Sequence, residues 1–405
     1  MHHHDIDAII AWVIGRGLAG GASEKMLLDG FCERCRRAGL DLSRALAIID
    51  TLHPIYEGRA FRWRNDGVEE EPVLEYRPTN VGEAAENWRR SAFFHLLQTG
   101  ESEVRRRLGK GEPADFLNLD VMKAEGQTDF VAFAHRFARD GVIGEMDCFY
   151  SYWLTRAADG FREADLAALR RLAPCLGLAI KSASLARIAG TLVEVYLGRD
   201  AGRRVLGGRI SRGVADRINA VLWFSDLRGF TRITDTAPPD EIIPLLNDYA
   251  EAVIASIHAA GGDVLKLIGD GTLAIFKADD PAESCRRALD AAAGLRRRIA
   301  AVNERRAAAD RPVTSVYLGL HVGEVFYGNI GSEERLDFTV VGPAVNEVAR
   351  IAAMCRSVDR AIVLSPEFVA ATAATERAPF VSLGRFALRG VGRAKELFTL
   401  DPAVL

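Results

Sequence analysis

The apolar positions between residues 215 and 400 repeat with two different periods, one typical of strands and the other of helices. A short apolar run at 220–224 predicts a buried strand, and apolar residues recurring every three or four positions from Pro239 to Ile257 predict an amphipathic helix. Further patterns predict strands at 263–266 and 272–276, a helix at 282–305, a strand at 316–322 and a hairpin to 338–341. The order strand, helix, two strands, helix, strand predicts a ferredoxin-like α/β (α+β) sandwich with a C-terminal extension.

The first 160 residues predict a second α/β unit. Helical patterns come first, at 5–15, 23–38 and 41–52, and strand patterns follow at 60–64, 73–76, 129–134 and 147–154. This order loosely resembles a GAF-like sensor domain, which implies a small-molecule or protein effector. Two interpretations of the aromatic residues from Phe149 to Trp153 stay open, namely the lining of a ligand pocket and plain core.

A long helical pattern joins the two halves. Leucine, isoleucine and valine recur every three or four residues from Leu166 to Val195, with one irregularity that Pro174 marks. This pattern favours a dimerising helix, and a packed intramolecular helix is the alternative. The arginine- and glycine-rich stretch at 198–217 predicts a hinge into the second half.

Composition narrows the class of protein. A chain of 405 residues with 49% apolar and 26% charged residues is typical of a soluble protein of two domains, and its net charge of −3 argues against a nucleic-acid partner. We expect no membrane span and no signal peptide. Six cysteines without a disulfide framework predict a reducing, cytoplasmic location, and we interpret Cys32 and Cys35 as thiols on a helix face, not zinc ligands.

Two aspartates stand where apolar strands end in glycine-bearing turns. Asp226 precedes Gly229, and Asp270 lies between two glycines. Side by side, two such carboxylates form a hard-oxygen site for a pair of Mg²⁺ or Mn²⁺ ions. An isolated aspartate at a strand end is more often a turn former or a helix cap.

A third segment favours the metal interpretation. Pro343 suits the first position of a helix, which places Asn346 and Arg350 four residues apart on one face. An amide and a guanidinium fork in that arrangement suit a sugar and a phosphate. The sequence therefore indicates nucleotide chemistry.

The three segments, in this order and spacing, resemble the catalytic domain of class III nucleotidyl cyclases, the adenylate and guanylate cyclases. The resemblance implies that two ions of Mg²⁺ or Mn²⁺ are held at Asp226, Leu227 and Asp270. It also implies that Asn346 orients the ribose and that Arg350 neutralises charge on the α-phosphate.

The same resemblance implies which base is read. Lys266 and Thr339 stand at the two base-recognition positions, where guanylate cyclases tend to have Glu and Cys. An ammonium group can donate to N1 of adenine, and a threonine hydroxyl can accept from its exocyclic amine. The pair therefore favours ATP, and a guanylate cyclase is an alternative.

The remaining expectations also follow from the resemblance. Backbone N–H groups of Gly229, Phe230 and Thr231, in the turn into the first helix, would bind the β and γ phosphates. Two exposed arginines near the C-terminus, Arg389 and Arg393, would add positive charge. The expected protein is a homodimeric adenylate cyclase whose parts are a GAF-like regulatory domain at 1–160, a dimerising helix and transducer linker at 161–214, and a catalytic domain at 215–405. A nucleotide-binding signalling protein without catalysis is the second alternative. The stretch 261–264 superficially resembles the diguanylate cyclase signature. Diguanylate cyclases lack the spacing of Lys266 to Asp270 and the helix that carries Asn346 and Arg350 here.

Overall fold

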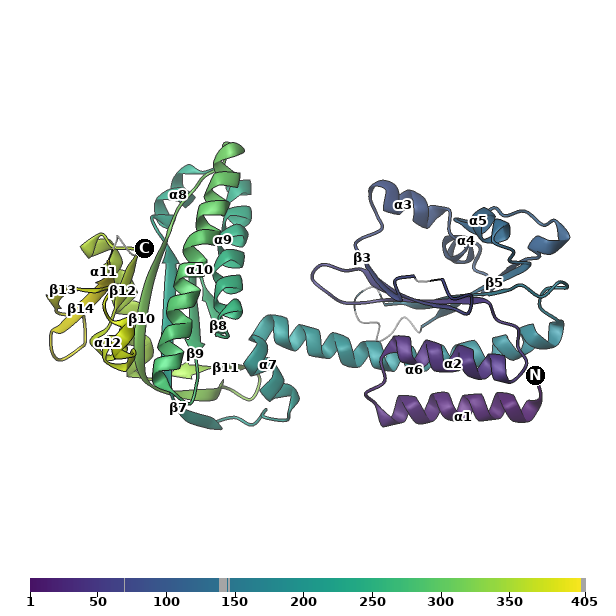
Figure 1. Cartoon of the computed structure of the whole chain (residues 1–405), viewed down its shortest axis with the longest axis horizontal. Coiled ribbons are helices and arrows are strands. Elements are labelled where there is room, and N and C mark those ends of the chain that lie inside the picture. The colour runs from purple at the N-terminus through teal and green to yellow at the C-terminus, as the bar shows by residue number, and fades with distance from the viewer. Residues whose placement is uncertain (69, 138–143, 145, 402–405) are drawn as a thin grey trace. The chain divides into compact units, whose positions relative to one another are not determined.

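The computed structural model describes residues 1–68, 70–137, 144 and 146–401, and the chain divides into two compact units, Met1–Leu192 and Val193–Leu405 (Figure 1). Each unit has a sheet of its own, with helices against it.

The first unit is built on a six-stranded antiparallel sheet in the order β3-β2-β1-β6-β5-β4. Its strands are β1 Arg44–Asp50, β2 Gly58–Arg64, β3 Val73–Tyr76, β4 Glu103–Arg106, β5 Asp129–Arg136 and β6 Cys148–Thr155. The helix predicted at 41–52 is wrong, because residues 44–50 form the central strand β1. Ala47 and Ile49 pack on one face of the sheet and Leu46 on the other, and a strand buried on both faces lacks the alternation that distinguishes it from a helix.

Helices cover both faces of this sheet (Figure 1). α1 His3–Ala19, α2 Glu24–Arg37 and α6 Glu163–Leu197 share one core with it. The opposite face packs against α3 Gly82–Arg89, α4 Ala92–Thr99 and α5 Leu119–Ala124, next to a short 3₁₀ turn at Leu108–Lys110. Phe149 and Trp153 are fully buried in the first core, which favours the plain-core interpretation. Cys32 and Cys35 are buried on α2 and form no disulfide, which confirms their predicted place on a helix.

α6 is one continuous helix that contains Pro174, so the predicted irregularity does not interrupt it. Its buried apolar positions pack into the core of the first unit, namely Leu166, Leu169, Leu172, Leu176 and Ile180. By length and composition alone, α6 is also apolar enough to cross a membrane, and 33% of its most apolar 18-residue stretch is buried. The expectation that the chain has no such segment is therefore not supported by composition, although core helices of soluble proteins pass the same test.

The predicted hinge at 198–217 contains a helix, α7 Arg199–Leu206. Asp200 on α7 accepts a hydrogen bond from Lys277 (2.8 Å), and Arg204 donates to Asp216 (2.7 Å). Ala201 is buried in the core of the second unit. These contacts hold α7 against that unit, so within the predicted hinge only Gly198 and residues 207–214 lie outside a helix or strand.

The sheet of the second unit follows the order β13-β14-β12-β10-β7-β9-β8, and β11 pairs with β10. Its strands are β7 Ala215–Leu227, β8 Asp263–Ile268, β9 Gly271–Phe276, β10 Val316–Gly331, β11 Leu336–Val341, β12 Ile362–Leu364, β13 Phe380–Phe386 and β14 Lys395–Leu400. β10, β7, β9 and β8 pair antiparallel, with two helices between strands in the predicted order. The ferredoxin-like arrangement is confirmed.

α9 Pro239–Ala259 and α10 Pro281–Ala308 cover one face of this sheet, and α11 Pro343–Val358 packs against β10 on the other face (Figure 1). The remaining helices are α8 Phe230–Thr236, α12 Pro366–Ala371 and a 3₁₀ turn at Ala374–Glu376. Gly319 of β10 permits the close approach of α11, because a Cβ there would lie 2.6 Å from Ala352 N and 2.8 Å from Val348 O. This contact fixes the helix that presents Asn346 and Arg350.

Candidate active site

The two predicted metal aspartates lie close together at neighbouring strand ends. Asp226 is near the end of β7, and Asp270 is in the turn between β8 and β9. Because β7 and β9 pair up to Ser225 and Thr272, the turn reaches the end of β7. The backbone N–H of Leu227 donates a hydrogen bond to Asp270 Oδ2 (3.1 Å), which ties the turn to the strand.

The electrostatics of this pair suit a cation. Burial, together with the negative charge of Asp270, raises the pKa of Asp226 to about 6, while Arg356 opposes the shift. Asp226 Oδ1 is buried and accepts no hydrogen bond from the described residues. A half-buried carboxylate with a free oxygen and a second carboxylate nearby fits a divalent ion with oxygen ligands. Asp226 and Asp270 would hold it.

The segment after Leu227 turns sharply into a helix. Gly229 adopts a left-handed conformation (φ 68°), which glycine accepts without strain, and it precedes α8. Phe230 and Thr231 are the first residues of α8, where backbone N–H groups have no acceptor within the helix. The turn therefore leaves donors free beside the aspartate pair.

α11 presents Asn346 and Arg350 one turn apart, as predicted. The guanidinium of Arg350 lies against Gly390, since a Cβ at Gly390 would be 3.3 Å from Arg350 Nη2. Gly390 has φ 71° and belongs to the loop between β13 and β14, which also carries the exposed residues Arg389 and Arg393. Among the described residues, neither Asn346 nor Arg350 makes a hydrogen bond or ion pair, so both side chains are available to a ligand.

The two predicted base-reading residues come from β8 and β11, which lie against each other. Lys266 of β8 forms an ion pair with Asp337, two residues before Thr339. Side chains two apart in a strand share a face, so Asp337 and Thr339 face the same way while Phe338 and Val340 are buried. Sequence reasoning gave no role to Asp337, although its period-two spacing from Thr339 was a usable signal.

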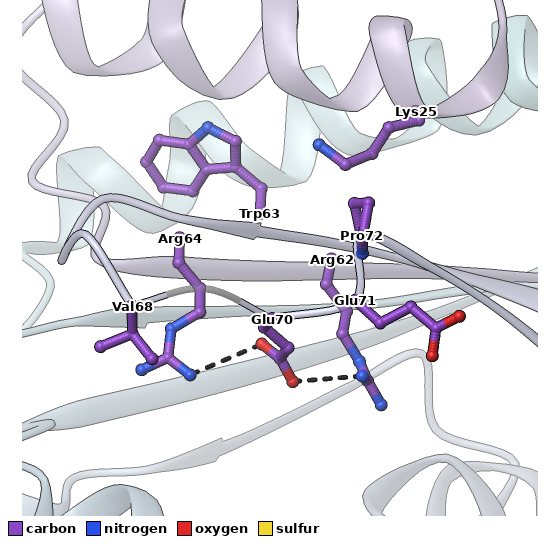
Figure 2. Close-up of a pocket in the computed structure, with 8 residues that line it drawn as sticks. All are labelled: Lys25, Arg62, Trp63, Arg64, Val68, Glu70, Glu71 and Pro72. Carbon is purple, nitrogen blue, oxygen red and sulfur yellow. Dashed lines mark hydrogen bonds and ion pairs between the residues drawn. The ribbon is translucent and has the colours of Figure 1, made fainter.

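The first unit has a cavity of about 550 Å³ beside β2 and α2 (Figure 2). The basic side chains that line it are already paired. Glu70 forms ion pairs with Arg62 (3.2 Å) and Arg64 (3.5 Å), and Lys25 pairs with Asp29 on its own helix. Among the residues drawn in Figure 2, no basic side chain is therefore left unpaired to select an anionic effector.

Comparison with known proteins finds a family match within the second unit. Residues 215–401 match the family model of the adenylate and guanylate cyclase catalytic domain. An adenylate cyclase of Anabaena cylindrica is 36% identical over 146 residues, which cover 35% of this chain and 28% of that protein. An uncharacterised protein of Mycobacterium tuberculosis is 33% identical over 210 residues, which cover 51% of this chain and 36% of that protein. The chain thus spans about a third of the length of these curated relatives.

Solved structures also match. The adenylyl cyclase CyaB from P. aeruginosa has 22% identity and a TM-score of 0.43, covering 46% of this chain and 95% of its own. The guanylyl cyclase Cya2 has 26% identity and a TM-score of 0.41, with coverages of 46% and 93%. The two neighbours differ in the nucleotide that their names state.

Proposed function

We propose that this chain, whose residues 215–401 are an adenylate/guanylate cyclase catalytic domain, converts ATP into 3′,5′-cyclic AMP and pyrophosphate. The observation that carries the proposal is the pair Asp226 and Asp270, joined through Leu227 N–H and left with a free buried oxygen. Two divalent ions at this pair would activate the ribose 3′-hydroxyl and bind the triphosphate. The free N–H groups of the turn at 229–231 would bind phosphate oxygens.

The choice of ATP rests on the face shared by Lys266, Asp337 and Thr339. Lys266 donates to N1 of adenine in this proposal, and Thr339 Oγ1 accepts from the exocyclic amine. Asp337 holds the Lys266 ammonium beside the strand of Thr339 in the free chain, which supports the pairing. A guanine base would place an N–H donor opposite the ammonium, and two donors facing each other disfavour binding.

We place Asn346 and Arg350 in the active site of a second copy of the chain. Both side chains lack partners among the described residues, as a composite site requires. Large apolar side chains are exposed on the strands around the base-reading face, which suits a two-fold interface, namely Leu267, Ile268, Phe326, Ile330, Leu336 and Val341. Arg350 would neutralise charge on the α-phosphate, with Arg389 and Arg393 nearby.

The test is product formation by the purified chain. Incubation with ATP or GTP and either Mg²⁺ or Mn²⁺ should yield cyclic AMP from ATP at a rate well above that of Asp226→Asn. Cyclic GMP as the main product would support the guanylate cyclase alternative. Nucleotide binding without cyclic product would favour the signalling protein without catalysis.

Mixing two inactive variants tests the shared site. Dimers of Asp226→Ala lack the metal site, and dimers of Arg350→Ala lack the transition-state cation. Each mixed dimer would regain one complete site, so random exchange should restore roughly a quarter of wild-type activity, since half the dimers are mixed. If fully exchanged mixtures stay inactive, Arg350 acts within its own chain.

A further inference from the structure

Three elements of the second unit place ionisable side chains around an imidazole of a fourth, away from the aspartate pair in the sequence. His321 of β10 is 3% exposed, and it lies on the face of β10 that packs against α11. Glu347 of α11 and Glu367 of α12 approach it, and Lys395 opens β14. One ligand atom from each of His321, Glu347 and Glu367 lies within 4.8 Å of the other two.

The contacts of the ring decide which nitrogen can bind a ligand. Ser365 Oγ lies 2.9 Å from His321 Nδ1, and Glu367 Oε2 lies 3.6 Å from it. Because these two acceptors are the nearer ones, we assign the proton to Nδ1. Burial lowers the pKa of His321 despite the two nearby carboxylates.

With the proton on Nδ1, the lone pair of His321 Nε2 faces a carboxylate oxygen of Glu347, which is also an acceptor. Glu347 Oε2 lies 3.9 Å from Nε2, and neither atom offers a proton to the other. Gly323 places no side chain beside Nε2, since a Cβ there would lie 3.1 Å from that atom and 2.5 Å from Ala344 Cβ. Glu367 Oε2 is buried and accepts no hydrogen bond from the described residues. A cation bound by these atoms would satisfy all three.

We propose that His321, Glu347 and Glu367 form a binding site for a divalent transition-metal ion of the zinc class, separate from the catalytic aspartates. One imidazole and two carboxylates leave a fourth position to water. Ligand atoms of tetrahedral zinc lie about 3.3 Å apart, given bonds of about 2.0–2.1 Å. Glu347 Oε2, 3.9 Å from Nε2, reaches this spacing through a small side-chain movement. Glu367 must turn its carboxylate from the Nδ1 edge of the ring toward Nε2. Hydrogen bonding of Nδ1 to Ser365 would fix the tautomer, as is usual for metal-bound histidine.

Lys395 occupies the position of the cation in the metal-free chain. Its ammonium forms ion pairs with Glu367 Oε1 (2.6 Å) and with Glu347. Two carboxylates and one ammonium leave a net charge of −1, whereas two carboxylates and a divalent ion are neutral. The Lys395 side chain is 20% exposed, so its head group can turn into solvent when the metal binds. Metal and Lys395 therefore compete.

Zinc titration followed by calorimetry tests this site. The full chain would carry Asp226→Asn, Asp270→Asn and alanine at 2–4, which removes the catalytic pair and the N-terminal histidine run. We expect one equivalent of Zn²⁺ to bind this protein. Glu347→Gln and His321→Gln should each weaken that binding at least tenfold, and Lys395→Met should tighten it at least tenfold.

The matched control is His135→Gln, which removes a half-buried imidazole of the first unit whose buried Nδ1 has no partner among the described residues. It should leave zinc affinity unchanged. Zinc binding that is the same with and without Glu347 and His321, or no tighter after Lys395→Met, would overturn the proposal. Lys395→Met keeps the test decisive even if His321→Gln fails to fold. Because the background is catalytically inactive, the result is independent of the proposed function.

Discussion

Replacing Gly319 with alanine should separate the helix α11 from the sheet. The new Cβ would lie 2.6 Å from Ala352 N and 2.8 Å from Val348 O, and both atoms belong to the helix backbone. Ordinary contact requires about 3.5 Å, so α11 must recede by roughly 0.7–0.9 Å. Overpacking of this kind costs about 1–3 kcal/mol of stability. A displacement near 1 Å at catalytic groups can lower turnover by about 10²-fold, and α11 presents Asn346 and Arg350.

Two measurements check this prediction. Hydrogen exchange of the amides at 343–358 should become faster in Gly319→Ala, and cyclic nucleotide production should fall by about two orders of magnitude. The matched control is Gly294→Ala within α10, where the nearest atoms, from Ser256, would be 3.9 Å from the new Cβ. This change should stabilise the protein by up to about 1 kcal/mol and leave turnover unchanged. Wild-type exchange in α11 of Gly319→Ala would refute the close-packing argument.

Three further predictions concern charge, base choice and regulation. The raised pKa of Asp226, about 6 against 3.8, means that the metal-free chain should lose about 1–2 kcal/mol of stability as pH rises from about 4 to 6, after allowance for solvent screening. Thermal melts in chelator should show this loss, and Asp226→Asn should abolish it. Lys266→Glu with Thr339→Cys should raise the ratio of GTP to ATP use about 5- to 150-fold, since one base contact contributes about 1–3 kcal/mol. Deleting residues 1–192 should change specific activity several-fold and remove any effector response.

Each of these has a clear contradicting outcome. Melting that is insensitive to Asp226→Asn between pH 4 and 6 would mean that the carboxylate is not destabilised in the folded chain. Full preference for ATP in the double variant would remove Lys266 and Thr339 from base recognition. If the truncated chain keeps its activity and its effector response, the first unit does not regulate the second.

Periodicity predicted the second unit well because its strands and helices differ in period and are separated by glycine and proline. β7 begins five residues earlier than the predicted strand, since residues 215–219 alternate between exposed and half-buried positions instead of forming an apolar run. In the first unit the same rule failed at β1, where both faces are buried. Apolar content alone does not separate such a strand from a helix.

The candidate site likewise has contacts that the sequence could predict and contacts that it could not. Asp226 and Asp270 could be predicted to meet because each ends a strand, and the paired strands β7 and β9 bring the two ends together. The contact between Arg350 and Gly390 could not, since it joins a helix to a distant loop through packing that no local pattern records. The ion pair of Lys266 with Asp337 likewise depends on β8 and β11 lying together without sharing a ladder.

The unsatisfied oxygen of Asp226 bears on the folding stability of the protein and therefore on its abundance in a cell. Without a cation, the folded chain keeps a buried acceptor unsatisfied beside a second carboxylate, which lowers its stability. Ligands that bind only the folded state shift the folding equilibrium toward it by mass action. Differences of 1–2 kcal/mol alter the abundance of a protein in a cell by several-fold. The supply of divalent metal and nucleotide would then govern how many copies escape degradation, in addition to how fast each copy works.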